Sequence, residues 1–379
     1  MRIAVVGAGV AGCAVARELV CDHEVVVVER DQVAGSATAL AAGEVTMTPS
    51  YTDIPSVAEY ANEFFRTYDG TGHFTFSECE SLELVTDEHR EAARRRVGRL
   101  QEDGIDVAFL DAQWVSELYP SFDLDGTPYG GAVRFDDTGF VDPYTFASTL
   151  ADDARADGAE FRTGVTVTGV ADSDGAVTGV ETTDGTVPAD AVVAAAGWRT
   201  RDLLADAVPL PVRPYRTQCV VLSADVPISD GLPMGWVPGE RAYFRPERNG
   251  DFLVGGWSAA VEDPEAASSD ADEAFRDHVA GLVPKLLDGF DGARFVDGWA
   301  GVDGATPDTR PIIDTPDDSP DGLVIATGFH GRGIMTAPVA ATAVNAHLTG
   351  VDAPFPLDEF ALDRFDSRTT DFEFQSVSA

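Results

Sequence analysis

Basic residues are scarce in this sequence, and Lys285 is its only lysine. Its 26 lysine and arginine residues face 65 aspartate and glutamate residues, which gives a formal net charge of -39. The acids are spread along the whole chain, without the blocks of about five or six like charges that mark an acidic tail. Such a field repels phosphates, so we expect no nucleic-acid partner. It favours a surface adapted to a high-salt cytoplasm, where ions screen the self-repulsion.

Cysteine is also rare, and long apolar runs are missing. The four cysteines (Cys13, Cys21, Cys79 and Cys219) form no C-x-x-C pair and no metal-ligand spacing, so we expect free thiols and no metal site. Every apolar run falls well short of the ~20 residues that span a bilayer. The N-terminus leads directly into an apolar strand pattern rather than a signal peptide. The sequence therefore predicts a soluble, cytoplasmic protein with no integral membrane segment.

Residues 1–30 carry the clearest motif of the chain. An apolar run over 2–6 leads into Gly7-Ala-Gly-Val-Ala-Gly12, which reads G-x-G-x-x-G, and a second apolar run ends at Glu29. In this pattern the glycines permit a tight turn, close approach of a pyrophosphate and close packing of the helix on the strand. The helix N-terminus attracts phosphate, and the terminal acid accepts hydrogen bonds from ribose. We therefore predict a dinucleotide site that contacts Gly7, Ala8, Gly9, Val10, Ala11, Gly12, Glu29 and Arg30.

The remaining pattern predicts an α/β fold whose dinucleotide layer is discontinuous in sequence. Helical spacing marks residues 54–68, 88–101, 269–287 and 334–348, and a helix starts at Pro143 behind its N-cap Asp142. Buried strand patterns recur at residues 191–196 and 323–327. We assign 1–45, 139–204 and 301–379 to a Rossmann-like domain, and 46–138 and 205–300 to a mixed-sheet substrate domain with helices. An NAD dehydrogenase more often keeps its dinucleotide domain contiguous, so the discontinuity favours FAD.

Taken together, these motifs resemble the FAD-dependent D-amino-acid oxidase superfamily, which includes glycine oxidase, sarcosine oxidase and D-arginine dehydrogenase. The resemblance covers nearly the whole chain. Its markers are Gly7–Gly12 with Glu29, Gly35–Gly43, Gly139–Pro143, Val192–Gly197, Pro214–Arg216, Trp299–Gly301 with Thr306–Asp308, and Gly328–Gly333. The combination is specific to the superfamily but not to one substrate.

The resemblance implies the rest of the FAD site. Its elements are the loop residues Ser36, Ala37, Thr38, Ala42 and Gly43, then Val167 at the adenine, Ala196 and Gly197 on the pyrophosphate side, and the turn formed by Gly328, Gly331, Arg332, Gly333 and Ile334. In that turn, the backbone N–H groups of 331–334 would face the carbonyl edge of the flavin. Tyr243 matches a tyrosine that binds the substrate carboxylate in this superfamily.

The departures from the family pattern are equally informative. Relatives attach flavin through a cysteine or a histidine where this chain has Gly301 and Leu40, so the FAD is expected to be non-covalent. Relatives place a carboxylate-binding arginine where Asp303 stands; Arg332, Arg245 or Arg216 could replace it, or Asp303 could bind a cationic or polar group. The flavin-facing lysine of sarcosine oxidases aligns with Leu253, which favours a dehydrogenase over an oxidase.

We therefore expect an enzyme that oxidises the C–N bond of an amino acid or N-methylated amino acid. Hydride would pass to the flavin, and the imine would hydrolyse to an oxo acid. The candidate catalytic and substrate-binding residues are His330, Arg332, Tyr243, Arg245 and Asp303. His330 is either a base for the substrate or a structural loop histidine. Two alternatives stay open, a 2-hydroxy-acid dehydrogenase and a flavin subunit that relays electrons within a complex. In each case an acceptor, oxygen or a carrier, must take the electrons.

Overall fold

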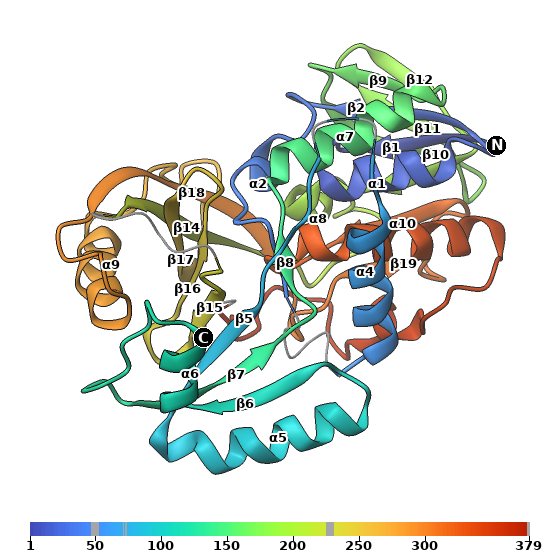
Figure 1. Ribbon diagram of the computed structural model, residues 1–379. Coiled ribbons are helices and arrows are strands. Elements are labelled where there is room, and N and C mark those ends of the chain that lie inside the picture. The colour runs from blue at the N-terminus through green and yellow to red at the C-terminus, as the bar shows by residue number, and fades with distance from the viewer. Residues whose placement is uncertain (47–52, 71, 73, 225–230, 377–379) are drawn as a thin grey trace.

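The computed structural model describes residues 1–46, 53–70, 72, 74–224 and 231–376 (Figure 1). Its N-terminal unit consists of β1 (Arg2–Val6), α1 (Val10–Leu19) and β2 (Glu24–Glu29). The two strands are parallel, with Val5 opposite Val27. β-branched residues suit a strand that is buried on both faces. The strand–turn–helix–strand unit predicted from the first thirty residues is confirmed.

Six strands form one sheet in the order β19-β20-β13-β1-β2-β9. β13 pairs in parallel with both β1 and β20, so the strand predicted near residue 191 returns to the first unit. β19 is an antiparallel edge strand beside β20. Strands from the beginning, middle and end of the chain thus build one sheet, which confirms the predicted discontinuous assembly. The bounds are Glu160–Thr163 for β9, Ala191–Ala194 for β13, Ile312–Asp314 for β19 and Leu323–Thr327 for β20.

Helices cover one face of this sheet, where α1 packs against both α7 (Pro143–Ala156) and α10 (Gly333–Thr349) (Figure 1). α7 begins as predicted, because the Asp142 carboxylate accepts a hydrogen bond from the Thr145 amide at 2.7 Å. α10 carries no Asp, Glu, Lys or Arg and is buried along most of its length. The opposite face packs against a small antiparallel sheet. Its strands are β10 (Val167–Ser173), β11 (Ala176–Thr182) and β12 (Gly185–Pro188).

α4 (Pro55–Thr67) belongs to the same helical layer. Its Tyr60 hydroxyl lies 2.5 Å from the Thr342 hydroxyl of α10, and its Phe65 ring lies 5.2 Å from the Phe146 ring of α7. This differs from the sequence-based assignment of residues 46–138 to the second layer. The uncharged surface of α10 needs an apolar partner, and the buried face of α4 supplies it.

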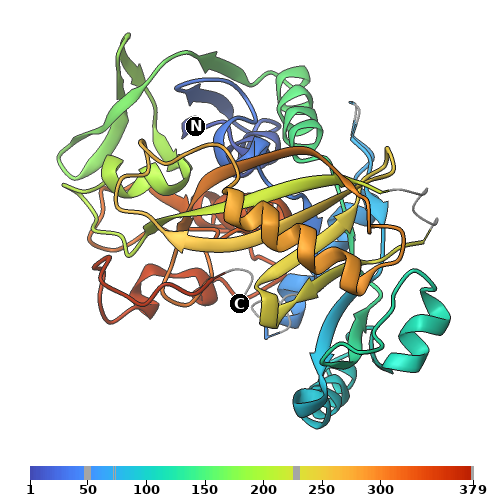
Figure 2. The same ribbon diagram turned by 90° about the vertical axis from the view of Figure 1, so that its left-hand side faces the viewer.

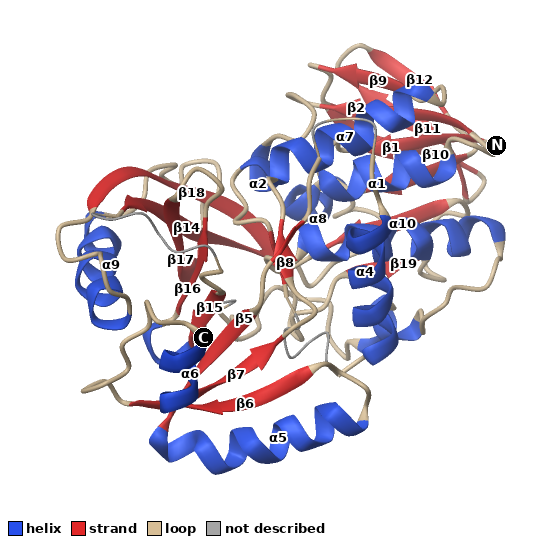
Figure 3. Cartoon of the chain, in the orientation of Figure 1, coloured by secondary structure: helices blue, strands red, loops and turns tan. Residues whose placement is uncertain are grey.

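An eight-stranded sheet in the order β18-β14-β17-β16-β15-β5-β7-β6 forms the second large layer (Figure 2). α9 (Glu273–Leu286) packs on one face of it through Phe275 and Val279, on the side away from α10 (Figure 3). The predicted domain boundary at residue 301 falls inside β18. The bounds are Ser81–Thr86 for β5, Val107–Asp111 for β6, Tyr129–Phe135 for β7, Arg213–Ser223 for β14, Met234–Val237 for β15, Ala242–Pro246 for β16, Asp251–Ala260 for β17 and Arg294–Ala305 for β18.

Short elements complete the fold. Among them are the strands β3, β8 and β4, which form a small sheet; the Phe140 ring of β8 lies 4.7 Å from the Arg245 guanidinium of the large sheet. The bounds are Ser36–Ala39 for α2, Glu44–Val45 for β3, Ser77–Glu78 for β4, Arg90–Glu102 for α5, Ala112–Leu118 for α6, Gly139–Phe140 for β8 and Thr200–Leu203 for α8. The four cysteines are free thiols. None of the described helices combines the length and apolar character needed to cross a bilayer.

Candidate active site

The turn between β1 and α1 requires glycine at two positions. Gly7 has φ +101°, and a Cβ on it would lie 2.5 Å from the Ala195 carbonyl oxygen. A Cβ on Gly12 would lie 2.0 Å from the carbonyl oxygen of Gly7. Gly9 is less crowded, since its nearest neighbour would be the Thr38 hydroxyl at 3.3 Å. The first and third glycines therefore close the turn, while the second leaves backbone open to a ligand.

A cavity of about 990 Å³ starts at this turn and extends to the eight-stranded sheet. A volume of this size accommodates a large ligand. Most of the residues predicted to hold the dinucleotide line it. They are Gly7, Gly9, Val10, Ala11, Glu29, Arg30, Ser36, Ala37, Thr38, Ala42, Gly43, Val167, Ala196, Gly197, Gly331, Arg332, Gly333 and Ile334. Ala8, Gly12 and Gly328 do not line it and instead support the turns behind it.

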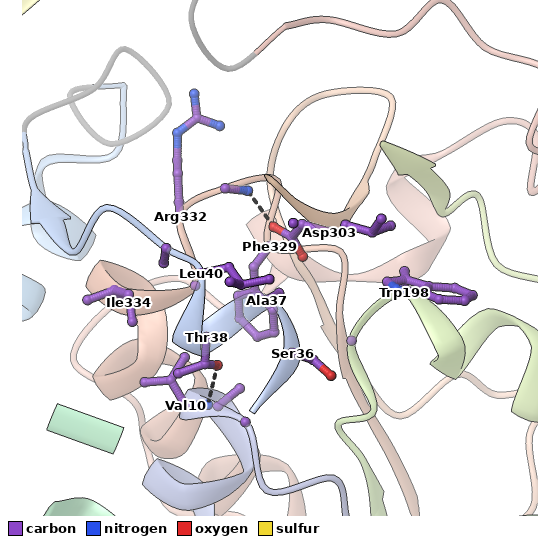
Figure 4. Close-up of a pocket in the computed structure, with 18 of the residues that line it drawn as sticks. Val10, Ser36, Ala37, Thr38, Leu40, Trp198, Asp303, Phe329, Arg332 and Ile334 are labelled. Atoms are coloured by element: carbon purple, nitrogen blue, oxygen red, sulfur yellow. Dashed lines mark hydrogen bonds between the residues drawn. The ribbon is translucent and has the colours of Figure 1, made fainter. Parts of the chain in front are cut away.

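Hydrogen bonds within the protein orient the polar groups around the start of α1. The Glu29 carboxylate accepts hydrogen bonds from the amides of Ala8 and Asp31, both at 2.8 Å. A carboxylate has lone pairs left for ribose hydroxyls when it accepts one bond at each oxygen. The Thr38 hydroxyl accepts from the Val10 amide at 3.0 Å, which fixes α2 against the helix N-terminus (Figure 4). These contacts fit a dinucleotide whose pyrophosphate lies at α1.

The turn before α10 differs in one respect from the expectation. Gly331 lines the cavity, but its amide donates to the Asp303 carboxylate at 2.7 Å. The Arg332 amide donates to the Phe329 carbonyl at 2.9 Å. Two of the four N–H groups expected to face a flavin carbonyl are therefore engaged within the protein. The amides of Gly333 and Ile334 lie in the first helical turn, where no intrahelical partner exists.

Asp303 lines the cavity from β18 (Figure 4). Besides the Gly331 amide, its carboxylate accepts from the Gly304 amide at 2.8 Å. Tyr215, its cross-strand neighbour on β14, places a hydroxyl 3.4 Å from the same carboxylate. Burial raises the pKa of Asp303, although these three donors oppose that effect. The site thus holds a carboxylate that can take up a proton more readily than an ordinary aspartate.

His330 lies outside the cavity lining, and both of its ring nitrogens have protein partners. Nδ1 accepts from the Thr306 amide at 3.2 Å, so Nε2 carries the proton and donates to the Gln375 carbonyl at 2.7 Å. The ring is fully buried and stacks on Phe374 with an interplanar angle of 2°. Burial, followed by the positive charge of Arg332, lowers the pKa of His330 to about 4. This geometry supports the structural interpretation of His330 rather than the catalytic one.

The candidate carboxylate-binding arginines are not equivalent. Arg216 faces away from the cavity and forms an ion pair with Asp272 at 3.1 Å. Arg245 is buried, does not line the cavity, and donates to the Ala42 carbonyl at 2.5 Å while pairing with Glu247 at 3.0 Å. Arg332 does line the cavity, but it extends away from Asp303 (Figure 4) and donates to the Thr309 carbonyl at 3.1 Å. Among the three, only Arg332 is placed for contact with a ligand.

Alternate residues of β14 form the wall opposite the nucleotide turn. Tyr215 and Thr217 both line the cavity, and the buried Thr217 hydroxyl has no partner among the described residues. Tyr243 reaches this wall from β16 across Gly255, whose Cβ would lie 2.2 Å from the tyrosine ring. Its hydroxyl is 3.8 Å from the Cys219 sulfur, and burial raises its pKa well above the ordinary value. Tyr215 and Thr217 were missing from the predicted site. They are two positions apart in one strand, so strand periodicity places their side chains on the same face of the sheet.

The two positions at which relatives attach flavin lie together here. A Cβ on Gly301 would lie 3.0 Å from the Leu40 Cβ, and both residues line the cavity. The Trp299 indole N–H donates to the Leu40 carbonyl at 2.9 Å and fixes this contact. Neither side chain has an atom that can form a covalent bond to a flavin. Among the described residues no group of His, Cys, Asp and Glu could hold a metal ion.

Comparisons with known proteins agree with this architecture. The model of the family "FAD dependent oxidoreductase" matches residues 2–346. The chain is 32% identical to the glycine oxidase of Pseudomonas putida over 187 residues, 49% of each chain. It is 28% identical to the D-amino acid dehydrogenase of Cereibacter sphaeroides over 418 aligned positions, 93% of each. The chain spans half or less of the first curated relatives that it matches.

A solved structure shows the same fold. The crystal structure of glycine oxidase from Geobacillus kaustophilus superposes with a TM-score of 0.84 at 23% identity, covering 97% of this chain and 100% of that one. At this level of identity the likeness concerns the fold.

Proposed function

The chain belongs to the FAD dependent oxidoreductase family, and from this premise we propose that it oxidises the C–N bond of an amino acid or N-methylated amino acid. The observation that carries the proposal is the position of Asp303. Its carboxylate lines the cavity beside the first turn of α10, next to the Tyr215 hydroxyl. An amine substrate is an ammonium ion in water, and it must lose a proton before its C–H bond can release hydride. A buried carboxylate of raised pKa suits that task.

FAD is the cofactor of the family, and the cavity fits it. The α1 turn, Glu29, Ser36 and Thr38 would hold the dinucleotide half, and the first turn of α10 would face the flavin. Bound FAD supplies the hydride acceptor. Leu40 and Gly301, which meet where relatives attach their flavin, support a non-covalent cofactor.

In the proposed reaction the substrate ammonium donates a hydrogen bond to Asp303 and then transfers a proton to it. The α C–H bond breaks as hydride, the nitrogen lone pair forms the C=N bond, and water hydrolyses the iminium to an oxo acid and an amine or ammonia. Tyr243 and Thr217 would bind the polar remainder of the substrate from β16 and β14. The two sheets would exclude bulk water from the reacting carbon.

The printed names of the relatives support an amino-acid substrate, since they include a glycine oxidase and a D-amino acid dehydrogenase. The 2-hydroxy-acid alternative depended on His330 as a base. Both nitrogens of that ring are bonded within the protein, so this alternative has lost its main support.

We also propose that the enzyme is a dehydrogenase. Leu253, at the position of the oxygen-activating lysine of sarcosine oxidases, is buried in β17. Lys285, the only lysine, lies exposed on α9 and does not line the cavity. Without a lysine at position 253, we expect slow reoxidation in air and fast reoxidation by an artificial acceptor.

The test is anaerobic bleaching of the flavin band in molar salt with D-amino acids, L-amino acids, N-methylglycines and 2-hydroxy acids. Bleaching by an amine, with a rate about a hundredfold lower in Asp303→Asn, is the expected result. Asp297→Asn, an exposed residue of the same strand, is the matched control and should leave the rate unchanged. Bleaching by hydroxy acids alone would establish the alternative, and a flavin that no small molecule reduces would favour an electron-relay subunit.

A further inference from the structure

Glu44 is a cavity residue that the mechanism above does not use. It opens β3 directly after Gly43, whose φ of +77° and tight packing against the Val141 carbonyl fix the backbone at that point. β3 pairs with β8, with Glu44 opposite Phe140. The side chain is therefore held by paired backbone rather than by a free loop, and it faces the same cavity as Tyr243 and Thr217.

The carboxylate of Glu44 lacks the partners that a buried charge requires. Its Oε1 is buried and has no hydrogen-bond donor among the described residues. The nearby cation, Arg245, donates instead to the carbonyls of Ala42 and Pro246 and pairs with Glu247 at 3.0 Å. The Arg245 guanidinium therefore pairs with Glu247, and no ion pair joins it to Glu44 among the described residues. Buried charges in proteins are normally both paired and hydrogen-bonded. An ionised Glu44 would lack a cation to pair with and a donor for its buried Oε1 among the described residues.

The electrostatics agree with the geometry. Burial raises the pKa of Glu44 to about 8, and the charge of Arg245 offsets only part of this. The field of Glu44 also reaches the substrate wall, since it contributes to raising the pKa of Tyr243. A cationic ligand group beside Glu44 would restore the ionised carboxylate and satisfy its free oxygen.

Glu83 provides an internal comparison, because it is another of the glutamates that line the cavity. Its carboxylate accepts a hydrogen bond from the Arg96 guanidinium and so is already neutralised by the protein. Between these two glutamates of one cavity, the structure leaves Glu44 without a donor for its buried oxygen.

We propose that Glu44 is a specificity-determining residue, which binds an ammonium or guanidinium group at the far end of the substrate from the reacting carbon. The preferred substrate is then an amine or amino acid that carries a second cationic centre. This inference rests on the proposed function, in which Asp303 receives the amine that is oxidised.

The experiment compares pairs with the same carbon skeleton that differ by one terminal ammonium group: ornithine with norvaline, and lysine with norleucine, in both enantiomers, with glutamate as an acidic probe. Anaerobic flavin reduction is measured in wild type, Glu44→Gln and Glu83→Gln. In wild type we expect the rate constant over the dissociation constant to favour the cationic member at least tenfold, because a desolvated charge-assisted bond is at stake. Glu44→Gln should lose this ratio while the values for norvaline and norleucine change little. Glu83→Gln should keep it.

A wild type that prefers norvaline or glutamate, or a Glu44→Gln variant that keeps the preference, would overturn the inference. FAD content and melting temperature establish that each variant is folded. A binding readout works without turnover: 1,4-diaminobutane should raise the melting temperature of wild type more than butylamine does, and this difference should vanish in Glu44→Gln. If no amine bleaches the wild-type flavin, the proposed function fails, and the melting experiment alone decides whether Glu44 binds a cation.

Discussion

His330 offers a direct test of whether this turn residue is structural or catalytic. The perturbation is His330→Asn. Asparagine tolerates the residue's φ of +50° and keeps an acceptor for the Thr306 amide. It removes the donor to the Gln375 carbonyl and the ring stacked on Phe374. It also removes an imidazole whose pKa is lower in the folded state than in the unfolded chain.

The magnitude follows from proton linkage. The pKa of His330 is lowered from 6.5 to about 4 in the folded state. The unfolded chain therefore binds more protons than the folded one within this window, and stability falls as the pH falls through it. At about pH 5 this one group costs wild type about 2 kcal/mol relative to about pH 7.5. The asparagine variant carries no such term, so the stability gap between the two proteins should narrow by that amount on acidification.

Urea unfolding in molar salt, at several pH values across the window, measures the gap. Taking the difference between wild type and variant cancels the many carboxylates that both proteins share. His89→Asn, a substitution of an exposed histidine, controls for the exchange itself. A gap that stays constant with pH would refute the buried neutral ring. So would a flavin-reduction rate that falls more than about a hundredfold in a variant with full FAD content, since that is the scale of a lost catalytic base.

Four further predictions concern the scaffold. Gly12→Ala should reduce bound FAD more than tenfold, because its Cβ would lie 2.0 Å from the Gly7 carbonyl oxygen. Gly98→Ala, a helix glycine with open space around it, should instead raise stability by about 0.5–1 kcal/mol in denaturant unfolding. Arg245→Met should cost about 3 kcal/mol, measured the same way, because it loses the bond to the Ala42 carbonyl and unpairs a carboxylate. The melting temperature should rise between dilute buffer and molar KCl if the net charge of -39 destabilises the fold; a value indifferent to salt contradicts this.

The dinucleotide layer was predictable because its signals are local. Glycine spacing, strand runs and the Asp142 cap each act within a few residues, and all three are found where the sequence indicates them. The assignment of α4 to the second layer was wrong. The sequence pattern of an amphipathic helix shows that one face is apolar, but it does not show which element packs against that face. The contact between Tyr60 and Thr342 joins residues 282 positions apart, and no spacing rule reaches that far.

The substrate end of the cavity was less predictable for the same reason. The sequence indicated three candidate arginines for binding a carboxylate. The fold shows that two of them, Arg216 and Arg245, each form an ion pair with a carboxylate of the protein. His330 likewise looked reactive in its glycine-rich turn, while its partners come from residues 306 and 375, which are remote in the chain. Residue type suggests a role, but the partners decide whether the group is available for it.

An acid-rich chain makes this distinction sharper. With 65 aspartate and glutamate residues, the presence of a carboxylate says nothing about function, because water and salt ions satisfy those on the surface. A buried carboxylate cannot be stabilised by water and salt ions in this way. Its hydrogen-bond donors must come from the protein or from a bound ligand. Asp303 finds two amides and a hydroxyl, which lets it persist and exchange a proton. Glu44 leaves a buried oxygen unsatisfied. Within one cavity, the hydrogen-bonded Asp303 is suited to take a proton, and the unsatisfied Glu44 is suited to bind a cation.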